Sequence, residues 1–250
     1  MRAYVCLNAD IGELPGWAGR ALDAAILEVV SRCSIACGGH AGDVVSMAET
    51  LRMGQARGVH AGAHPSYPDR EGFGRTRKNM SLAELAVSLR GQVSDLQAIA
   101  ATEGVELRHI KPHGALYNDA AREADLARLV VALCGESGIT TLLGPPASEM
   151  ERAARVAGLT YIAEGFADRA YEADLSLTPR GLPGAVFEDH AAQRAQALEM
   201  VLKLQVTART GEILPLRIDT LCLHGDTPGA AENAVSLRGA LEASGISIRP

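Results

Sequence analysis

The sequence predicts an α/β fold in which seven parallel strands close into a distorted, TIM-like (β/α) barrel. Seven short apolar segments recur along the chain, and patterns typical of amphipathic helices separate them. Alternating strands and helices predict a parallel sheet with right-handed crossovers. A Rossmann sheet is less consistent with the sequence, because no GxGxxG motif follows the first strand and polar residues end many strands rather than one.

Each predicted strand is a short apolar run that ends near a polar or chemically reactive side chain. In chain order the runs span residues 5–10, 34–40, 59–64, 110–113, 141–144, 161–164 and 220–226. In parallel α/β folds the carboxyl ends of the strands meet at one face, and this face carries the active site. The polar endings therefore predict one shared pocket, which is typical of an enzyme.

Helical patterns fill the gaps between these strands. The predicted helices span residues 18–31, 44–57, 81–101, 121–134, 148–157, 190–210 and 231–243. Ser81 and Glu84 fit a capping box at the start of the third helix, and Ser244-Gly245 is a suitable stop for the last. No linker rich in Ser, Pro or Gly divides the chain, so we expect a single domain over residues 1–250.

Two connections, residues 65–80 and 168–189, are too long for simple turns. Loops of this length in a compact domain usually act as lids or binding loops. The first contains Gly72-Phe73-Gly74-Arg75, which offers a mobile loop with a cation at its end. Arg75 is therefore a candidate contact for an anionic group, although a solvated surface charge is the commoner role for such an arginine.

The composition restricts the class of protein. The net charge of −6 and the lack of a basic cluster argue against nucleic acid as a partner. Five cysteines without a CxxC pair predict reduced thiols, as in a cytoplasmic protein. We expect no signal peptide, because polar residues interrupt the first apolar segment, and no membrane partner, because no run approaches roughly 18–20 apolar residues.

Candidate chemical residues first appear at the end of the first predicted strand. Asn8 and Asp10 point to the same side of an extended chain, and Glu13 follows closely. A carboxylate and an amide at a strand end can bind a cation or position a substrate. An Asx turn leaving the strand would also explain these residues.

Histidines follow the next two predicted strands. His40 comes directly after two glycines, and a proline follows His64, so both are candidate bases or ligands. Asp43 is also expected to cap the following helix. His60 and His64 are about 13 Å apart along a strand, which is too far for one metal ion. We therefore interpret His60 as a structural residue.

Lys111 and His113 point to one side of the fourth predicted strand, with Pro112 stiffening the backbone between them. A lysine within a strand is costly to bury unless it is paired, which favours a functional role over packing. Such a lysine can hold a phosphate or a carboxylate as a point charge.

The last polar strand ends carry further ionisable residues. Glu164, Asp168 and Arg169 follow the sixth strand, where an ion-pair network alone would also account for them. His224 and Asp226 follow the seventh, and Asp226 would either orient His224 or cap the last helix. There is no P-loop, GxSxG elbow or HExxH motif, so a nucleotide site here would use other signatures.

Six segments, in this order, resemble the LamB/YcsF family. They are LNADIGE, SIACGGHAGD, GAHPSYPDREGFGRTR, IKPHGALYN, EGFADRAYEADLSL and CLHGDTPGA. The resemblance implies a seven-stranded barrel related to glycoside hydrolases and deacetylases. It also implies cleavage of the lactam 5-oxo-L-proline to L-glutamate with hydrolysis of ATP, together with partner subunits B and C. Cys6 and Leu175 depart from the family, which usually has Asp and Gly there.

The motif match and the polar strand ends together define the predicted site. We expect catalytic roles for Asp10, His40, His64, Lys111, His113 and His224. We expect substrate or nucleotide contacts from Asn8, Glu13, Asp43, Arg75, Asp168, Arg169 and Asp226. ATP is the implied cofactor. A divalent metal ion, magnesium or another, would be held by Asp10, His40 and His64.

Two other functions fit the same residues. One is a metal-dependent amide hydrolase or carbohydrate deacetylase that uses Asp10, His60 and His64 without ATP. The other is a non-catalytic subunit that binds 5-oxoproline or a partner and leaves the chemistry elsewhere.

Overall fold

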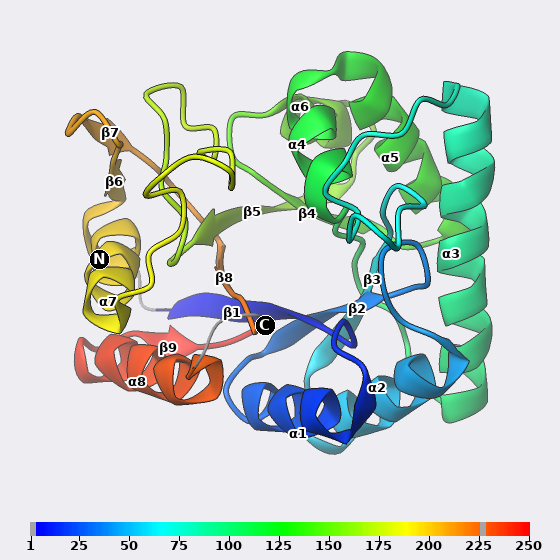
Figure 1. The fold of residues 1–250 in the computed structure, drawn as a ribbon, viewed down its shortest axis with the longest axis horizontal. Helices are drawn as coiled ribbons and strands as arrows, with labels where there is room; N and C mark the ends of the chain where they lie inside the picture. Colours follow the sequence, from blue (N-terminus) through cyan, green and yellow to red (C-terminus); the bar gives the residue numbers. More distant parts are fainter. Residues whose placement is uncertain (1–3, 226–228) are drawn as a thin grey trace.

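The computed structural model describes residues 4–225 and 229–250 and shows a curled parallel sheet surrounded by helices (Figure 1). Six strands pair in the order β3-β2-β1-β8-β5-β4. Their bounds are β1 (Tyr4–Ile11), β2 (Arg32–Ala36), β3 (His60–His64), β4 (Thr141–Gly144), β5 (Thr160–Phe166) and β8 (Thr220–Leu223). A short strand near the C-terminus, β9 (Ser247–Ile248), pairs with the start of β1.

The segment around Ile110 joins the two edges of this sheet. Ile110 forms parallel bridges with Ala63 of β3 and with Leu142 of β4. The Lys111 amide donates to Ala63 O, and the Leu143 amide donates to Ile110 O, both at 2.9 Å. The predicted seven-membered barrel is therefore confirmed, with its fourth member reduced to a short bridge. Pro112 ends this bridge because it has no N–H to donate.

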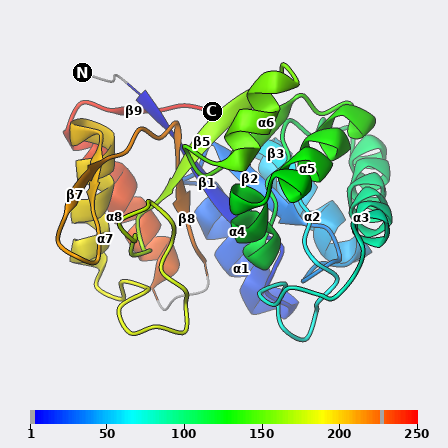
Figure 2. The ribbon, with the colours of Figure 1, turned by 90° about the horizontal axis from the view of Figure 1, so that it is seen from above.

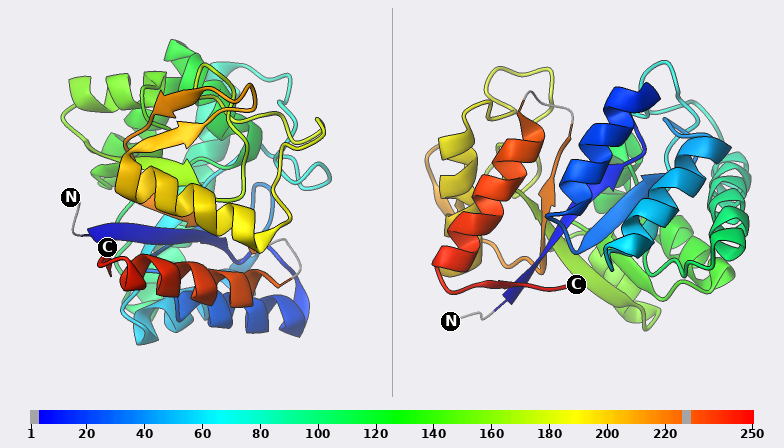
Figure 3. Two further views of the ribbon diagram at one scale, coloured as in Figure 1. Left: turned by 90° about the vertical axis from the view of Figure 1, so that its left-hand side faces the viewer. Right: turned by 90° about the horizontal axis from the view of Figure 1, so that it is seen from below.

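Helices pack on the outside of the barrel (Figures 1 and 3). Their bounds are α1 (Gly16–Leu27), α2 (Val44–Ala56), α3 (Leu82–Glu103), α4 (Gly114–Arg122), α5 (Ala124–Ser137), α6 (Glu149–Val156), α7 (His190–Leu198) and α8 (Ala230–Ala243). The predicted capping box begins α3, where Ser81 and Glu84 each accept from the other's backbone N–H. None of the helices in the described part of the chain has the length and apolar character needed to cross a membrane.

Two of the predicted helices have different boundaries in the structure. The helix predicted at 121–134 is two helices, because Glu123 is extended and separates α4 from α5. The helix predicted at 190–210 ends in a π-helical turn, η1 (Glu199–Lys203). Leu204 then adopts a left-handed conformation, with φ of 55°, and reverses the chain. A hairpin of β6 (Gln205–Thr207) and β7 (Ile213–Pro215) follows it.

The barrel interior is filled partly by a histidine. His109 is fully buried, and its Nε2 lies 3.3 Å from Ser34 Oγ. A Cβ on Gly62 would lie 2.4 Å from the His109 ring, so only glycine leaves room for that ring. Burial lowers the pKa of His109 well below its ordinary value, and the ring is neutral. His109 is thus a packing residue. All five cysteines are buried and unpaired.

Both long loops lie at the carboxyl ends of the strands (Figure 2). The first is anchored by Lys78, whose Nζ lies 2.5 Å from Asp69 Oδ1. The second is held by Arg169, whose guanidinium donates to Thr178 O at 2.6 Å and to Ala185 O at 3.3 Å. The loops therefore form the walls of the barrel end that carries the predicted site residues.

Candidate active site

The carboxyl ends of the strands open into a cavity of about 310 Å³. Both long loops contribute to its wall, Arg75 from the first and Arg180 from the second. Most of the predicted site residues line it. They are Asp10, Glu13, His64, Arg75, Lys111, His113, Arg169 and His224. The barrel thus brings strand ends that are far apart in the sequence into one pocket, which we call the site cavity.

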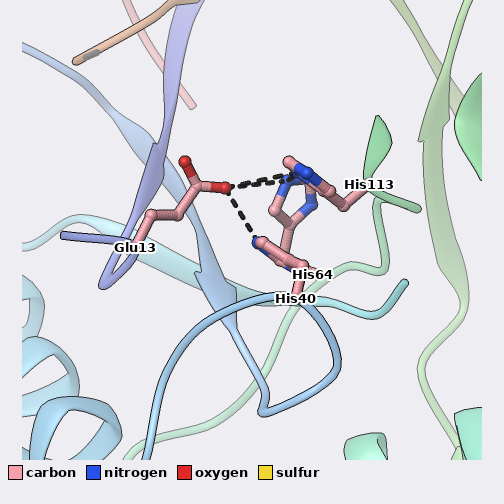
Figure 4. Close-up of side chains that lie close together, drawn as sticks. All are labelled: Glu13, His40, His64 and His113. Atoms are coloured by element: carbon pink, nitrogen blue, oxygen red, sulfur yellow. Dashed lines mark hydrogen bonds and ion pairs between the residues drawn. The ribbon is translucent and has the colours of Figure 1, made fainter. Parts of the chain in front are cut away.

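Glu13 and three histidines form a cluster beside this cavity (Figure 4). Glu13 Oε1 lies 2.9 Å from His40 Nε2, 3.3 Å from His113 Nδ1 and 3.8 Å from His64 Nε2. His113 Nδ1 lies 2.9 Å from His64 Nε2. One carboxylate oxygen and three ring nitrogens therefore converge, and we call these four residues the histidine cluster.

Two backbone carbonyl groups fix the protons of the facing histidines. His64 Nδ1 donates to Lys111 O at 2.7 Å, and His113 Nε2 donates to Phe73 O at 2.9 Å. A carbonyl oxygen only accepts, so each of these nitrogens carries a proton. Burial and the neighbouring His64 and His40 lower the pKa of His113 well below its ordinary value, so this ring is neutral. Its Nδ1 therefore presents a lone pair, which faces His64 Nε2.

The donor atoms of the histidine cluster converge at distances that fit a metal ion. In a tetrahedral site with bonds of about 2.0–2.1 Å, ligand atoms lie roughly 3.3 Å apart. The contacts here range from 2.9 to 3.8 Å. Metal-bound histidines usually donate their second N–H to a carbonyl or carboxylate, as His64 and His113 do. One carboxylate and several imidazoles suit zinc and related transition metals.

This cluster differs from the predicted metal ligands, which are Asp10, His40 and His64. The structure keeps His40 and His64 together, adds Glu13 and His113, and places Asp10 at the edge of the group. Asp10 Oδ2 lies 3.3 Å from His64 Nε2. Asp10 therefore contacts a candidate ligand without belonging to the convergent set.

His40 packs against the other members of the cluster. Its ring stacks on that of His113 with centroids 3.6 Å apart, and the ring of Phe73 meets it edge-on. Burial and the nearby His64 lower the pKa of His40 to about 2, so this ring is neutral. Burial and the charge of Asp10 raise the pKa of Glu13. His40 and His113 thus enter the cluster as neutral rings beside a largely buried carboxyl group.

Lys111 forms a second buried group next to the cluster. Its Nζ lies 2.8 Å from Asp10 Oδ1, 2.8 Å from Glu164 Oε1 and 3.3 Å from Asn8 Oδ1. Burial alone would lower the pKa of Lys111, but Asp10, Cys222 and Glu164 outweigh it and raise the pKa well above its ordinary value. Two carboxylates hold this ammonium, which is 2% exposed, within the wall. The Lys111 ammonium is therefore a positive charge in a fixed position, and it does not move to close on a ligand.

The same ammonium accounts for a second set of potential metal ligands, Asp10, Cys222 and His224. Lys111 Nζ donates to Asp10 Oδ1 at 2.8 Å and to Cys222 Sγ at 3.3 Å. The Lys111 ammonium, a positive charge that the protein itself supplies, thus lies against these potential ligands. Burial would raise the pKa of Asp10, but His64 and Lys111 hold it well below its ordinary value.

His224, which lines the site cavity, forms an ion pair with Asp168. His224 Nδ1 lies 2.7 Å from Asp168 Oδ2, and both side chains are largely buried. Burial would lower the pKa of His224, but the charge of Asp168 outweighs it and raises the pKa. Burial would raise the pKa of Asp168, but His224 lowers it. The pair is therefore ionised over a wider pH range than either group alone.

We expect the substitution Asp168→Asn to destabilise the protein more at about pH 6 than at about pH 9. A raised histidine pKa contributes stability that is complete below the unfolded value, about 6.5, and is lost as the pH rises through the folded value. Urea unfolding of both proteins at the two pH values measures the difference. Asp95→Asn, at an exposed position, is the control. An equal loss at both pH values would contradict the ion-pair interpretation.

Two glycines let the first loop lie against the site. Gly74 and Gly114 have φ of 64° and 58°, in the left-handed region that favours glycine. A Cβ on Gly114 would lie 2.5 Å from Gly74 O, and one on Gly74 would lie 2.9 Å from atoms of His40 and His113. This close approach places Phe73 O where it accepts the proton of His113.

Arginines supply positive charge to the rest of the cavity wall. Arg75, Arg122, Arg169 and Arg180 all line it. Arg169 is engaged with the carbonyl groups of its own loop, as described above. Arg75 lies over the Phe73 ring, with its Cζ 4.9 Å from the ring centroid. A cavity with an acidic and imidazole floor and guanidinium groups in its wall suits an anionic substrate.

Several predicted site residues lie elsewhere. Asn8 is buried inside the barrel and donates to Thr220 Oγ1 at 2.9 Å. Asp43 is exposed and caps α2 by accepting from the Ser46 amide at 2.8 Å, so it has the expected capping role. Asp226 lies outside the described residues.

His60 is separated from the site, as its strand position predicts. It begins β3, whereas His64 ends it. Burial and the nearby Arg32 and Arg108 lower its pKa. In the described residues, neither candidate metal group includes His60. The ligand set Asp10, His60 and His64 is therefore not assembled.

Three contributors were absent from the predicted site. Glu164 and Cys222 both contact the Lys111 ammonium, and Phe73 contributes its backbone carbonyl. A signal for Cys222 was present, because it alternates with His224 along β8 as Asn8 alternates with Asp10. The role of Phe73 depends on loop conformation, which no residue pattern encodes.

A parallel barrel whose strand ends enclose a carboxylate and imidazole centre defines a (β/α)-barrel enzyme. The chain belongs to the LamB/YcsF family, whose model matches residues 5–250.

Relatives of known name cover almost the whole chain. The 5-oxoprolinase A-subunit of Methylococcus capsulatus is 47% identical over 249 residues, which are 99% of this chain and 96% of that protein. The 5-oxoprolinase A-subunit of Chloroflexus aggregans is 49% identical over 244 residues, 97% of each chain. The crystal structure of the lactam utilization protein from Thermus thermophilus matches with a TM-score of 0.88 at 38% identity, over 98% of this chain and 99% of that chain.

Proposed function

We propose that this chain is the A-subunit of an ATP-dependent 5-oxoprolinase, which opens the lactam ring of 5-oxo-L-proline to give L-glutamate. The relatives that bear this name support the proposal. The observation that carries it is the histidine cluster at the floor of an arginine-lined cavity, because this arrangement can activate water beside a bound anion. Subunits B and C are the proposed partners.

The overall reaction consumes lactam, water and ATP and yields L-glutamate, ADP and phosphate. Water adds its oxygen to the ring carbonyl carbon, the bond from this carbon to nitrogen breaks, and the nitrogen takes up protons. Transfer of the ATP γ-phosphoryl group to the lactam oxygen would make the carbon more electrophilic, and phosphate then leaves. Such a path needs a base for water, a proton donor for nitrogen and cations for the anionic groups.

The residues of the cavity are suited to these tasks. Asp10 lines the cavity beside the cluster, with its Oδ2 3.3 Å from His64 Nε2, and is the proposed base that takes a proton from water. His224, held by Asp168, is the group with a raised histidine pKa and suits a proton donor to the nitrogen. Arg75 and Arg180 are the proposed contacts of the substrate carboxylate or of the phosphoryl group.

A divalent metal ion is the second part of the proposal. His64, His113 and Glu13 would hold it, with His40 as the fourth ligand, because their donor atoms converge and the carbonyl groups fix the tautomers. Such an ion polarises a carbonyl group and lowers the pKa of water. Residues Asp10 and Lys111 lie beside it and balance the charge of the floor.

The test is the release of phosphate and L-glutamate by this chain, alone and mixed with subunits B and C, in the presence of ATP and 5-oxoproline. Coupled release by the assembled mixture, abolished by Asp10→Asn, is the expected result. Absence of coupled release from a mixture proven to be assembled would contradict the proposal.

A metal-dependent amide hydrolase that needs no ATP is the second candidate. The histidine cluster favours it, because a metal ion held there would polarise an amide carbonyl group and lower the pKa of water. ATP-independent hydrolysis or deacetylation by the metal-loaded chain, without partners, would support this function over the first.

A further inference from the structure

A second cavity of about 170 Å³ adjoins the site cavity. Its lining residues come from α4, the segment before α6 and the segment after β5. Figure 1 labels α4, α6 and β5. Residues common to both walls are Tyr117, Asn118, Arg122, Phe166 and Leu177. We propose that this side chamber is a subsite for the ammonium group that ring opening creates, with Glu164 as its partner. This inference rests on the proposed function, because the ligand is the product amino acid.

Glu164 is the buried acidic residue of the side chamber. It is 1% exposed, and its Oε1 lies 2.8 Å from Lys111 Nζ. Lys111 lines the site cavity, whereas Glu164 lines the side chamber, so their ion pair crosses the wall between the two. The buried Tyr117 hydroxyl lies beside Glu164, but neither it nor Glu164 Oε2 forms a hydrogen bond of normal geometry with the described residues. A buried carboxylate oxygen in this state favours a ligand with N–H donors.

The charges of the side chamber favour a cation. Its charged residues, among those described, are Glu164, Asp174 and Arg122, which leave one net negative charge when all are ionised. Hydrogen bonds from Ser176 lower the pKa of Asp174, and the charge of Arg122 lowers it further, so the exposed Asp174 and Arg122 partly neutralise each other. The carboxylate of Glu164 then has no opposite charge on the side that faces away from Lys111. The remaining wall is largely apolar, which suits a short aliphatic chain.

Backbone strain marks the same chamber. Ala147 and Leu175 have φ of 56° and 66°, and they line the chamber from two different loops. This backbone conformation is unfavourable for a residue with a Cβ, because the Cβ comes too close to the following carbonyl oxygen. Strain of this kind concentrates at ligand sites, where the surrounding structure holds the loop in place. Unfavourable conformations in two loops around one cavity indicate that the shape of this cavity serves ligand binding.

The chemistry of the reaction supplies a matching ligand. The lactam nitrogen is uncharged, and ring opening converts it into an ammonium, which is the one new cation of the product. The product is also longer than the ring and needs additional space. Lys111 repels this ammonium on the side of the site cavity, and Glu164 attracts it on the other. Arg122, which lines both cavities, is placed to contact a carboxylate of the same molecule.

Calorimetric titration with L-glutamate and with glutarate tests the subsite, because glutarate lacks only the ammonium group. We expect the wild-type chain to bind L-glutamate at least about tenfold more tightly than glutarate, since a charged hydrogen bond contributes about 1.5–3 kcal/mol. Ala121→Met fills the chamber from α4 and should abolish this preference. Ala98→Met, at an exposed position of α3, should retain it. Binding of 5-oxoproline by each variant shows that the site cavity is intact.

Equal binding of the two ligands by the wild type, no measurable binding of L-glutamate, or an unchanged preference in Ala121→Met would overturn the subsite. The coupled assay with subunits B and C separates this outcome from failure of the proposed function. Coupled activity without a preference for L-glutamate overturns the subsite alone. A preference without coupled activity supports the amine subsite and contradicts the 5-oxoprolinase assignment.

Discussion

Replacement of Lys111 by methionine is expected to abolish most coupled activity, by about 10²–10³-fold, and to lower the free energy of unfolding by about 3–5 kcal/mol. Methionine has nearly the same length but carries no charge. The variant leaves Asp10 and Glu164 buried without their common partner. The large effect follows because unpaired buried charges are far more costly than a lost contact. The coupled assay and urea unfolding measure the two effects.

The pH dependence of this variant distinguishes charge from packing. The loss of stability should shrink as the pH falls to about 4–5, because protonation removes the charge of unpaired carboxylates. Adding Glu164→Gln to Lys111→Met should recover part of the stability. Lys203→Met, at an exposed position, is the matched control and should change stability by less than about 0.5 kcal/mol. A loss that does not vary with pH would mean that Lys111 acts by packing alone.

The substitution His113→Ala is expected to weaken binding of zinc or manganese by more than about 100-fold, because it removes one convergent ligand and opens the cluster. Calorimetry on the chelator-treated protein measures the affinity directly. Wild-type protein should bind one ion. At a metal concentration about 100 times the Kd, this ion should raise the free energy of unfolding by about 2.7 kcal/mol. The variant should show little of this stabilisation.

His60→Ala is the matched control for the metal site. His60 is a histidine of the same strand as His64 but lies at its opposite end. The variant should bind metal as the wild type does. Equal loss in His60→Ala and His113→Ala, or a wild-type protein that binds no ion, would contradict the histidine cluster as the metal site. Loss in His60→Ala alone would favour the ligand set Asp10, His60 and His64.

The barrel was predictable because its signals are local. Apolar runs, helical periodicity and capping residues such as Ser81 depend on neighbours in the sequence, and the strand ends then meet by topology. The boundaries were less predictable where one residue decides them. Glu123 is extended between two helices, and Leu204 reverses the chain after η1, although neither residue type signals such a conformation.

The residues that form the site were more predictable than the contacts that each of them makes. The alternation of side chains along a strand is enough to place Asp10, Lys111 and His113 on the inner face. It does not reveal that Glu13, beyond the end of β1, is the carboxylate that the three histidines share, because Gly12 turns the chain with φ of 77°. Nor does it reveal that Lys111 is held between two carboxylates. Distances between side chains depend on loop paths and packing, which no short motif specifies.

The barrel is closed between β3 and β4 by the single bridging residue Ile110. Elsewhere neighbouring strands share runs of paired residues, but here one residue joins β3 to β4, and Pro112 ends the ladder. The two residues that flank this proline, Lys111 and His113, contact Asp10 on β1, Glu164 on β5 and His64 on β3. The side chains of the active centre thus also join the strands on either side of this bridge. A substitution of Lys111 or His113 therefore affects both the active centre and the closure of the barrel.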